Sequence, residues 1–264
     1  MLKPKKSLGQ NFLQNSEIVS EIINAASIQK TDRIIEIGPG LGVLTDALVK
    51  SGAQIFAIEK DFDLVERLRK GFQSNKNLKI IHQDALFFNL ETFENYKVVA
   101  NLPFNVATPL IRKFLESDVK PELMVLMVQK EVAERLTAKP GSRERSILTI
   151  LVEYYAEAEI IIEVSKTNFR PQPKVDAAVV KIKPKSHFQG GILVDEKLFF
   201  RIVKAGFSSK RQQIHNSLAA TLRLDKNIVQ DILQKSKIDS KLRAEDLTLE
   251  DWFRLSENLK NQLY

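Results

Sequence analysis

The tetrapeptide Asn101-Leu102-Pro103-Phe104 combines residue types that could hold and orient a nucleobase amine. Such an amine is a poor nucleophile because its lone pair is delocalised into the ring, so it must be turned toward its electrophile. The Asn101 side-chain oxygen and a backbone carbonyl of Leu102 or Pro103 could accept its two hydrogens. Pro103 stiffens the backbone, and Phe104 offers an apolar face for an extruded base. In isolation, the same residues also suit a strand-ending turn with a core Phe.

A glycine-rich turn precedes this segment in the chain. The sequence GPGLG at 38–42 follows a short apolar run and opens a helical pattern. Gly38 and Gly40 let a ligand approach the backbone, and the helix start offers unpaired N–H groups, so the turn predicts a nucleotide-like ligand. A dinucleotide fingerprint needs a small residue at position 43, where this chain has Val43. The spacing therefore disfavours a nicotinamide-dependent oxidoreductase.

Two carboxylates follow the next two apolar runs. Glu59 lies 21 residues after Gly38, and Asp84 follows the third run. Ligands of open α/β sheets bind beyond the carboxyl ends of the strands. There, Glu59 could accept hydrogen bonds from both ribose hydroxyls, and Asp84 could accept one from an adenine amino group. Each acid alone suits an exposed loop, but together with the glycines they indicate an adenosine pocket.

These residues require a sheet that brings strand ends together. Short apolar runs rich in Ile and Val predict buried strands, and the helical patterns between them indicate a parallel sheet with helices on both faces. Two later runs, 158–164 and 175–182, leave no room for a helix between them and predict an antiparallel hairpin at the sheet edge. The strands are expected at 33–37, 54–58, 78–82, 97–100 and 122–128, and the helices at 42–51, 62–74, 109–117 and 130–138.

The last quarter of the chain differs from the rest. A polar, Gly-containing segment at 185–191 reads as a linker, and only helical patterns follow it. At roughly 150 residues per domain, 264 residues suit one or two domains. We therefore predict an α/β domain over 1–187 and a small helical domain over 191–264. The helices of the second domain are expected at 195–207, 210–222, 226–235 and 249–259.

Positive charge is concentrated in the C-terminal part of the chain. The chain has 40 Lys and Arg against 33 Asp and Glu, and residues 181–243 hold 14 of the former and 5 of the latter. A basic stretch of this size predicts a polyanion such as nucleic acid as partner. A solvated helical face is the alternative.

The amino-acid composition excludes several kinds of structural site and several classes of protein. With zero Cys there is no disulfide framework and no thiolate zinc site, and three His leave little for a histidine metal site, so we expect no metal. No run reaches the roughly 18 apolar residues of a membrane span. Residues 1–13 are basic without the apolar region of a secretory signal, so we expect a cytoplasmic protein.

Six segments together resemble the KsgA/RsmA-type small-subunit ribosomal RNA adenine dimethyltransferases. The resemblance runs nearly from end to end, and NLPF followed by Asn105, with FRPQPKVD at 169–176, is its most specific part. It implies a Rossmann-like, seven-strand methyltransferase fold that uses S-adenosylmethionine, followed by a small helical domain. The segments are SLGQNFL (7–13), EIGPGLG (36–42), NLPFNVATPL (101–110), QKEVAERL (129–136), FRPQPKVDAAVV (169–180) and RAEDLTLEDWFRL (243–255).

The resemblance also assigns residues. It implies a target-adenine site of Asn101, Pro103 and Phe104, where the family usually has Tyr in place of Phe104. Glu144-Arg145, together with Gln213 and His215, depart from the family's pattern, which puts local RNA contacts in question but leaves the catalytic motifs intact. The implied cofactor contacts are Asn11, Leu13, Gly38, Gly40, Glu59, Lys60, Asp84, Ala85 and Asn101.

The expected activity is transfer of methyl groups from S-adenosylmethionine to the N6 amines of two adjacent adenines near the 3′ end of small-subunit rRNA. The expected partner is rRNA in an immature small subunit, with no membrane involved, and we expect a monomer. Three alternatives stay open: a large-subunit resistance methyltransferase, a catalytically idle nucleic-acid-binding relative, and the oxidoreductase. Intact GPGLG and NLPF motifs argue against the idle relative, and RAEDLTLEDW argues mildly against the resistance enzyme.

Overall fold

The computed structural model describes residues 10–185 and 195–263. Their contacts form two units, and the segment between residues 135 and 154 belongs to the second unit, although the residues on either side of it belong to the first. The predicted division between 1–187 and 191–264 assigned this segment to the first domain. The predicted linker at 185–191 lies, apart from Lys185, outside the described residues.

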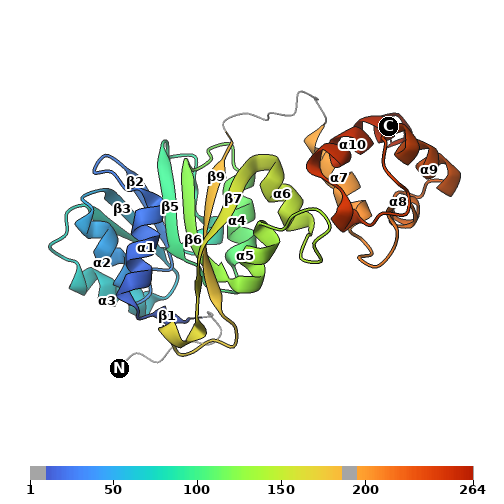
Figure 1. The fold of residues 1–264 in the computed structure, drawn as a ribbon. Helices are drawn as coiled ribbons and strands as arrows, with labels where there is room; N and C mark the ends of the chain where they lie inside the picture. Colours follow the sequence, from blue (N-terminus) through green and yellow to red (C-terminus); the bar gives the residue numbers. More distant parts are fainter. Residues whose placement is uncertain (1–9, 186–194, 264) are drawn as a thin grey trace. The chain divides into compact units, whose positions relative to one another are not determined.

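The first unit is built on a seven-stranded sheet with strand order β4-β3-β2-β5-β6-β9-β7 (Figure 1). The five strands from β4 to β6 are parallel, and the two last pairings are antiparallel. This confirms the predicted fold class and strand runs. The bounds are β2 Arg33–Ile37, β3 Gln54–Glu59, β4 Leu78–His82, β5 Tyr96–Asn101, β6 Leu123–Gln129, β7 Ala156–Val164 and β9 Ala177–Pro184.

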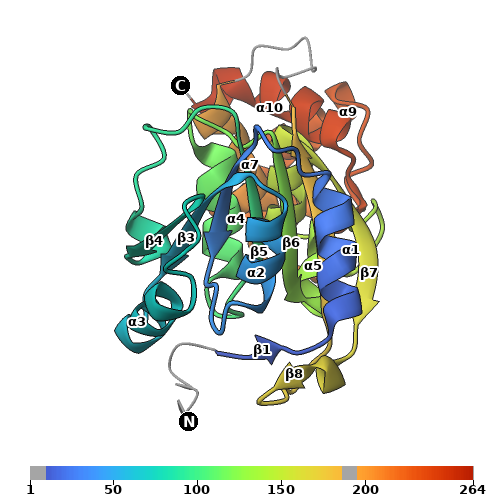
Figure 2. The same cartoon turned by 90° about the vertical axis from the view of Figure 1, so that its left-hand side faces the viewer.

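Helices cover both faces of this sheet. Figures 1 and 2 show α1, α2 and α3 on one face and α4 and α5 on the other. Each of the first three presents an apolar stripe inward, and α1 starts where the Asn15 side chain accepts a hydrogen bond from the Glu17 amide. The bounds are α1 Ser16–Ala26, α2 Val43–Lys50, α3 Phe62–Gly71, α4 Ala107–Glu116 and α5 Lys130–Leu136.

The central strands form the core. Residues 98–100 of β5 and 124–128 of β6 are buried without interruption, as expected for strands covered by helices on both faces. At the sheet edge, β7 pairs with β9 in antiparallel register, which confirms the predicted hairpin. The helices and hairpin thus hold the carboxyl ends of β2, β3, β4 and β5 at one edge of the sheet.

A separate two-stranded ribbon lies beside the carboxyl ends of these strands. Strand β1 (Phe12–Leu13) pairs with β8 (Phe169–Arg170), with Phe12 opposite Arg170. Asn15 also donates a hydrogen bond to the Asn168 side chain at 3.0 Å. The N-terminal segment is therefore fixed by residues that lie far along the chain, and the local sequence did not predict this pairing.

The second unit is helical. Its helices surround aromatic side chains, and the Phe199 ring lies 5.0 Å from that of Tyr154 and 4.8 Å from that of Phe253. Tyr154 belongs to α6, which the sequence pattern did not predict. The bounds are α6 Ile147–Tyr155, α7 Glu196–Gly206, α8 Ile214–Leu222, α9 Lys226–Lys235 and α10 Leu249–Leu263.

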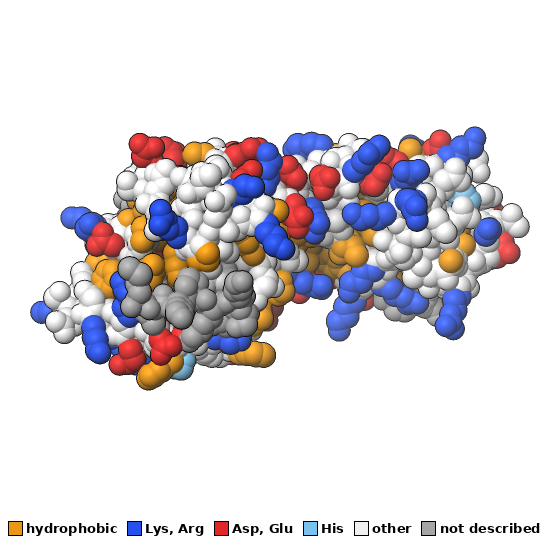
Figure 3. All heavy atoms as spheres, turned by 90° about the horizontal axis from the view of Figure 1, so that it is seen from below, with side chains coloured by type: hydrophobic (Ala, Val, Ile, Leu, Met, Phe, Trp, Pro, Cys, Tyr) orange, Lys and Arg blue, Asp and Glu red, His pale blue; other side chains and the backbone are white. Residues whose placement is uncertain are grey.

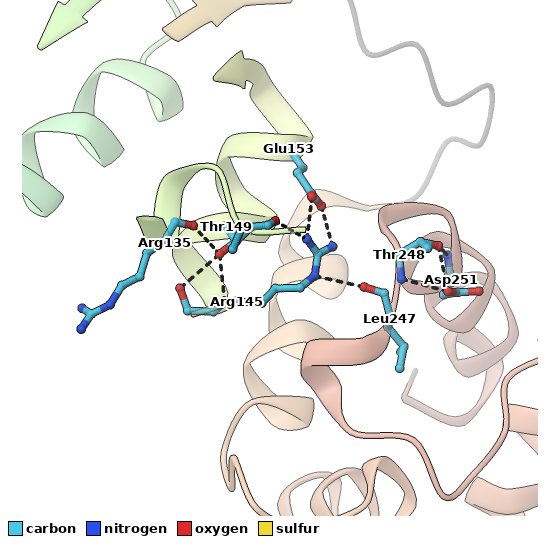
Figure 4. A network of polar contacts seen from close by, with 9 residues as sticks. Arg135, Arg145, Thr149, Glu153, Leu247, Thr248 and Asp251 are labelled. Carbon is cyan, nitrogen blue, oxygen red and sulfur yellow. Dashed lines mark hydrogen bonds and ion pairs between the residues drawn. The ribbon is translucent and has the colours of Figure 1, made fainter. Parts of the chain in front are cut away.

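Arg145 explains why the segment before α6 packs with this unit. Its guanidinium is fully buried and donates to both carboxylate oxygens of Glu153, at 2.6 and 2.7 Å (Figure 4). It also donates to the carbonyls of Ala138 and Leu247. A buried guanidinium needs this many acceptors, and Leu247 supplies one from the C-terminal part of the chain.

One predicted helix was partly wrong. The pattern at 210–222 predicted a single helix, but α8 begins at Ile214, after Gln213 in extended conformation. The preceding turn places Phe207 on Trp252, with ring centroids 5.7 Å apart. Tertiary packing thus prevails over local periodicity here.

The surface of the second unit is basic. Every Lys and Arg between residues 195 and 243 is exposed, and Figure 3 shows such side chains over this unit. Within the described residues, no helix is long and apolar enough to cross a membrane.

Candidate active site

A cavity of about 1190 Å³, including the part open to solvent, lies at the carboxyl ends of β2, β3 and β5. The Gly-rich turn, the N-terminal segment and the start of α4 complete its wall. Every site residue predicted from the sequence lines this cavity. They are Asn11, Leu13, Gly38, Gly40, Glu59, Lys60, Asp84, Ala85, Asn101, Pro103 and Phe104.

The Gly-rich turn connects two walls of the cavity. Gly38 and Gly40 have φ values of +64° and +59°, which L-residues rarely adopt. A Cβ added to Gly38 would lie 3.4 Å from the Pro103 ring, and one added to Gly40 would lie 3.0 Å from the Phe12 ring. A side chain at Gly38 would be in ordinary van der Waals contact with NLPF, whereas one at Gly40 would be crowded by the N-terminal segment, and the backbone at both positions is one that L side chains rarely adopt.

Glu59 ends β3 with a nearly buried carboxylate. Its Oε2 accepts from the Gly40 amide at 3.3 Å, and its Oε1 accepts from the Asp61 amide at 2.8 Å. Burial raises the pKa of Glu59, and these backbone donors oppose the shift. A carboxylate has about four acceptor directions, more than these backbone donors use, so a hydroxyl group of a ligand can still bind.

Asp84 follows β4 and is held on both oxygens. Its Oδ1 caps the 3-10 turn η2 (Ala85–Phe87) by accepting from the Leu86 amide, and its Oδ2 lies 2.8 Å from the Lys60 ammonium. The hydrogen bond from Lys60 lowers the pKa of Asp84. Asp84 is therefore an ionised acceptor at the cavity wall, next to Ala85.

The NLPF segment leaves β5 with its acceptors oriented. The Asn101 amide nitrogen donates to the Asn11 carbonyl at 3.4 Å, which leaves Oδ1 as the acceptor end of the side chain. The Pro103 carbonyl accepts from the Val106 amide at 3.1 Å. Of the two carbonyls considered from the sequence, Leu102 is therefore the better second acceptor. Phe104 is half-buried at the cavity wall.

Three residues at this site were not singled out from the sequence. Phe12 lies against Gly40, and Gln10 donates from its side chain to Asp61 at 2.9 Å. Glu36 lies inside the apolar run of β2, lines the cavity and is 1% exposed. Burial raises its pKa to about 8. An acid within a continuous apolar run was the available signal for Glu36.

Metal ligands do not gather at this site. Within residues 10–185 and 195–263, no group of three or more His, Cys, Asp or Glu side chains is placed to hold a metal ion. The polar groups that line the cavity are carboxylates, amides, backbone groups and the Lys60 ammonium, which suit hydroxyl and amine partners.

Comparison with known proteins gives one family over the whole chain. The model of the family described as "Ribosomal RNA adenine dimethylase" matches residues 1–261. A "Ribosomal RNA small subunit methyltransferase A" from Halothermothrix orenii is 40% identical, over 97% of this chain and 91% of that protein. A protein of the same name from Dehalococcoides mccartyi is 40% identical, over 96% of this chain and 88% of that protein.

Solved structures also resemble this chain. A dimethyladenosine transferase from Plasmodium falciparum has a TM-score of 0.81 and 27% identity, covering 95% of this chain and 98% of that one. The 23S rRNA methyltransferase ErmE has a TM-score of 0.75 and 24% identity, covering 95% of this chain and 100% of that one. The second likeness concerns the fold alone.

Proposed function

The chain belongs to the ribosomal RNA adenine dimethylase family, and from that premise we propose that it transfers methyl groups from S-adenosylmethionine to the N6 amines of two adjacent adenines near the 3′ end of small-subunit rRNA. The products are N6,N6-dimethyladenosines, formed during ribosome biogenesis. The observation that carries the proposal is that one cavity is lined both by the nucleoside-pocket residues Gly38 and Glu59 and by the amine-orienting segment 101–104.

The residues of the cavity suit this cofactor. The close approach at Gly38 and Gly40 leaves backbone, and no side chain, facing the ligand. Glu59 would accept from the ribose hydroxyls and Asp84 from the adenine amine, while Asn11, Leu13, Lys60 and Ala85 would complete the wall. The bound cofactor supplies an electrophilic methyl group on a sulfonium.

The NLPF segment would orient the target. Asn101 Oδ1 and the Leu102 carbonyl accept the two amine hydrogens, which directs the nitrogen lone pair toward the methyl group. Pro103 stiffens the loop, and Phe104 stacks on the extruded base. Positioning and electrostatics supply the rate, and no strong base is required because the methylated amine is acidic and can release its proton to water.

Basic residues of the second unit would hold the RNA through its phosphates. Contacts of this kind add affinity without sequence information. We propose that the substrate is rRNA in an immature small subunit and that the protein acts as a monomer in the cytoplasm.

The test uses ribosomal particles from strains that lack the modification. Small-subunit and large-subunit particles are incubated separately with the protein and methyl-labelled S-adenosylmethionine, and the RNA is digested for nucleoside analysis. Labelled dimethyladenosine in small-subunit RNA alone is expected. Label in large-subunit RNA alone would favour a resistance-type enzyme, and label in neither would indicate an idle binding protein.

A further inference from the structure

Lys113 on α4 holds the turn that carries Asp84. Its ammonium donates to the carbonyls of Ala85, Leu86 and Phe88, at 2.9, 2.8 and 2.6 Å. An ammonium has three N–H donors and no acceptor, so this one turn uses the full donor set. A surface lysine usually keeps its ammonium group in water, whereas the Lys113 ammonium is bound by three backbone carbonyls of one turn.

The turn depends on such a partner. The element η2 is a single 3-10 turn, and the carbonyls of so short a helix find few partners within it. Asp84 satisfies the amide of Leu86 at its start, and Lys113 satisfies carbonyls at its end. Asp84 is thus fixed in place by a turn that is held at both ends.

The same helix also forms part of the cavity wall. Leu110 lies three residues before Lys113, on the same side of α4, and lines the cavity with Asp84 and Ala85. Lys113 therefore sets the position of the turn relative to the apolar wall contributed by Leu110.

The positive charge of Lys113 also favours the form of Asp84 that accepts hydrogen bonds. The Lys113 ammonium helps Lys60 to lower the pKa of Asp84, which keeps this carboxylate ionised. Burial lowers the pKa of Lys113 itself, and Asp84 opposes that shift. An ionised Asp84 accepts hydrogen bonds and donates none, as an adenine amino group requires.

We propose that Lys113 is a positioning residue for recognition of the cofactor's adenine. It acts through the 84–88 turn and not by touching the ligand. The inference rests on the proposed use of S-adenosylmethionine and adds a determinant of its adenine specificity.

The experiment compares binding of two ligands by calorimetry. One is S-adenosylhomocysteine, and the other is its analogue in which hydrogen replaces the 6-amino group of adenine. For Lys113→Met we expect Kd for S-adenosylhomocysteine to rise by about tenfold or more, as for loss of a charge-assisted hydrogen bond. Kd for the deaminated analogue should rise much less, so the preference for the amine is lost. In methyl transfer, KM for the cofactor should rise while kcat at saturation changes little.

Two further variants make the test specific. Arg112→Gln is the matched control, since Arg112 is the adjacent residue of the same helix and forms an ion pair with Glu116 at the surface; both Kd values should match the wild type. Lys113→Arg keeps the charge and several donors and should restore part of the preference. If Lys113→Met does not fold by circular dichroism, Lys113→Gln takes its place, with a smaller rise expected.

The possible results distinguish a failure of the role proposed for Lys113 from a failure of the proposed function. Unchanged Kd values and an unchanged amine preference in a folded Lys113→Met or Lys113→Gln variant would overturn the role of Lys113. An equal rise for both ligands would also overturn it, because that indicates general damage to the cavity. Failure of the wild-type protein to bind S-adenosylhomocysteine would instead refute the proposed function.

Discussion

The guanidinium of Arg145 and the carboxylate of Glu153 form a bidentate ion pair, with N···O distances of 2.6 and 2.7 Å. The Arg145 side chain is fully buried, whereas that of Glu153 is 29% exposed. The pair bridges the segment before α6 and the body of that helix. Arg145 also reaches the Leu247 carbonyl, so one side chain connects three parts of the second unit.

Arg145→Met should destabilise the protein by about 3–5 kcal/mol, because it leaves buried acceptors and one carboxylate without their donor. Urea unfolding followed by circular dichroism measures this. The control is Lys50→Met, which removes an exposed i,i+4 pair with Asp46 and should change stability by no more than about 0.5 kcal/mol. Equal effects of the two variants would contradict a structural role for Arg145.

Asn101→Ala should bind S-adenosylmethionine within roughly tenfold of the wild type, because Asn101 is one of many groups lining the cavity. Methyl transfer should fall by on the order of a hundredfold or more, as for loss of a positioned polar group. Calorimetry and single-turnover transfer to small-subunit particles give the two numbers. A near-wild-type rate is incompatible with the assigned role.

Two substitutions of Phe104 distinguish base stacking by its ring from a requirement for a hydroxyl group at this position. Phe104→Tyr should keep activity because it keeps the ring, whereas Phe104→Ala should lose about 1–3 kcal/mol of base stacking in kcat/KM for RNA. Binding of S-adenosylhomocysteine serves as the control for an intact cavity. Full activity of the Ala variant would leave Phe104 with a packing role only.

Glu36 should make stability depend on pH. Burial raises the pKa of Glu36 from its ordinary value of 4.5 to about 8 in the folded state, so between these values the folded state retains a proton that the unfolded state releases. The free energy of unfolding therefore falls as pH rises through this window, by at most about 1.4 kcal/mol per pH unit. Glu36→Gln cannot release this proton, so it should become more stable relative to the wild type as pH rises. Urea unfolding at several pH values checks this; a constant difference would refute it.

Charge on the second unit should set the salt dependence of RNA binding. In Lys210→Gln/Arg211→Gln, the log–log slope against salt should flatten by about 0.7–0.9 for each phosphate contact removed. Full-length protein is required, because removing the C-terminal helices would uncover Tyr154. Lys70→Gln, which changes an exposed residue of α3 in the first unit, should leave the slope unchanged. A slope that is the same in both variants would place the RNA elsewhere.

The strands, and the places of Glu59 and Asp84 after them, were predictable because they depend on local sequence, whereas Asn11 and Leu13 were expected only from the family resemblance. The runs at 33–37 and 78–82 coincide with β2 and β4. Strand β2 is buried from Ile34 to Ile37, as expected for a strand covered by helices on both faces, whereas β4 is an edge strand and is only partly buried. Once the strands are placed, Glu59 and Asp84 follow at their ends.

Contacts between distant residues were not predictable in this way. Helix α6 has the sequence ILTILVEYY, whose apolar residues show no clear stripe. What fixes it is packing of Tyr154 on Phe199 and Phe253, which follow much later in the chain. Likewise, no local pattern places Lys113 on the carbonyls of 85–88.

The pairing of Phe12 with Arg170 has a consequence for biosynthesis. The strand that places Asn11 and Leu13 at the cavity is made first on the ribosome, yet its partner emerges only after more than half of the chain has been translated. Closing so long a loop is slow, and a ribbon this short has no stability of its own. A nascent chain that ends before residue 169 therefore lacks the support for one wall of its cavity, and competence to bind ligand arises late in translation.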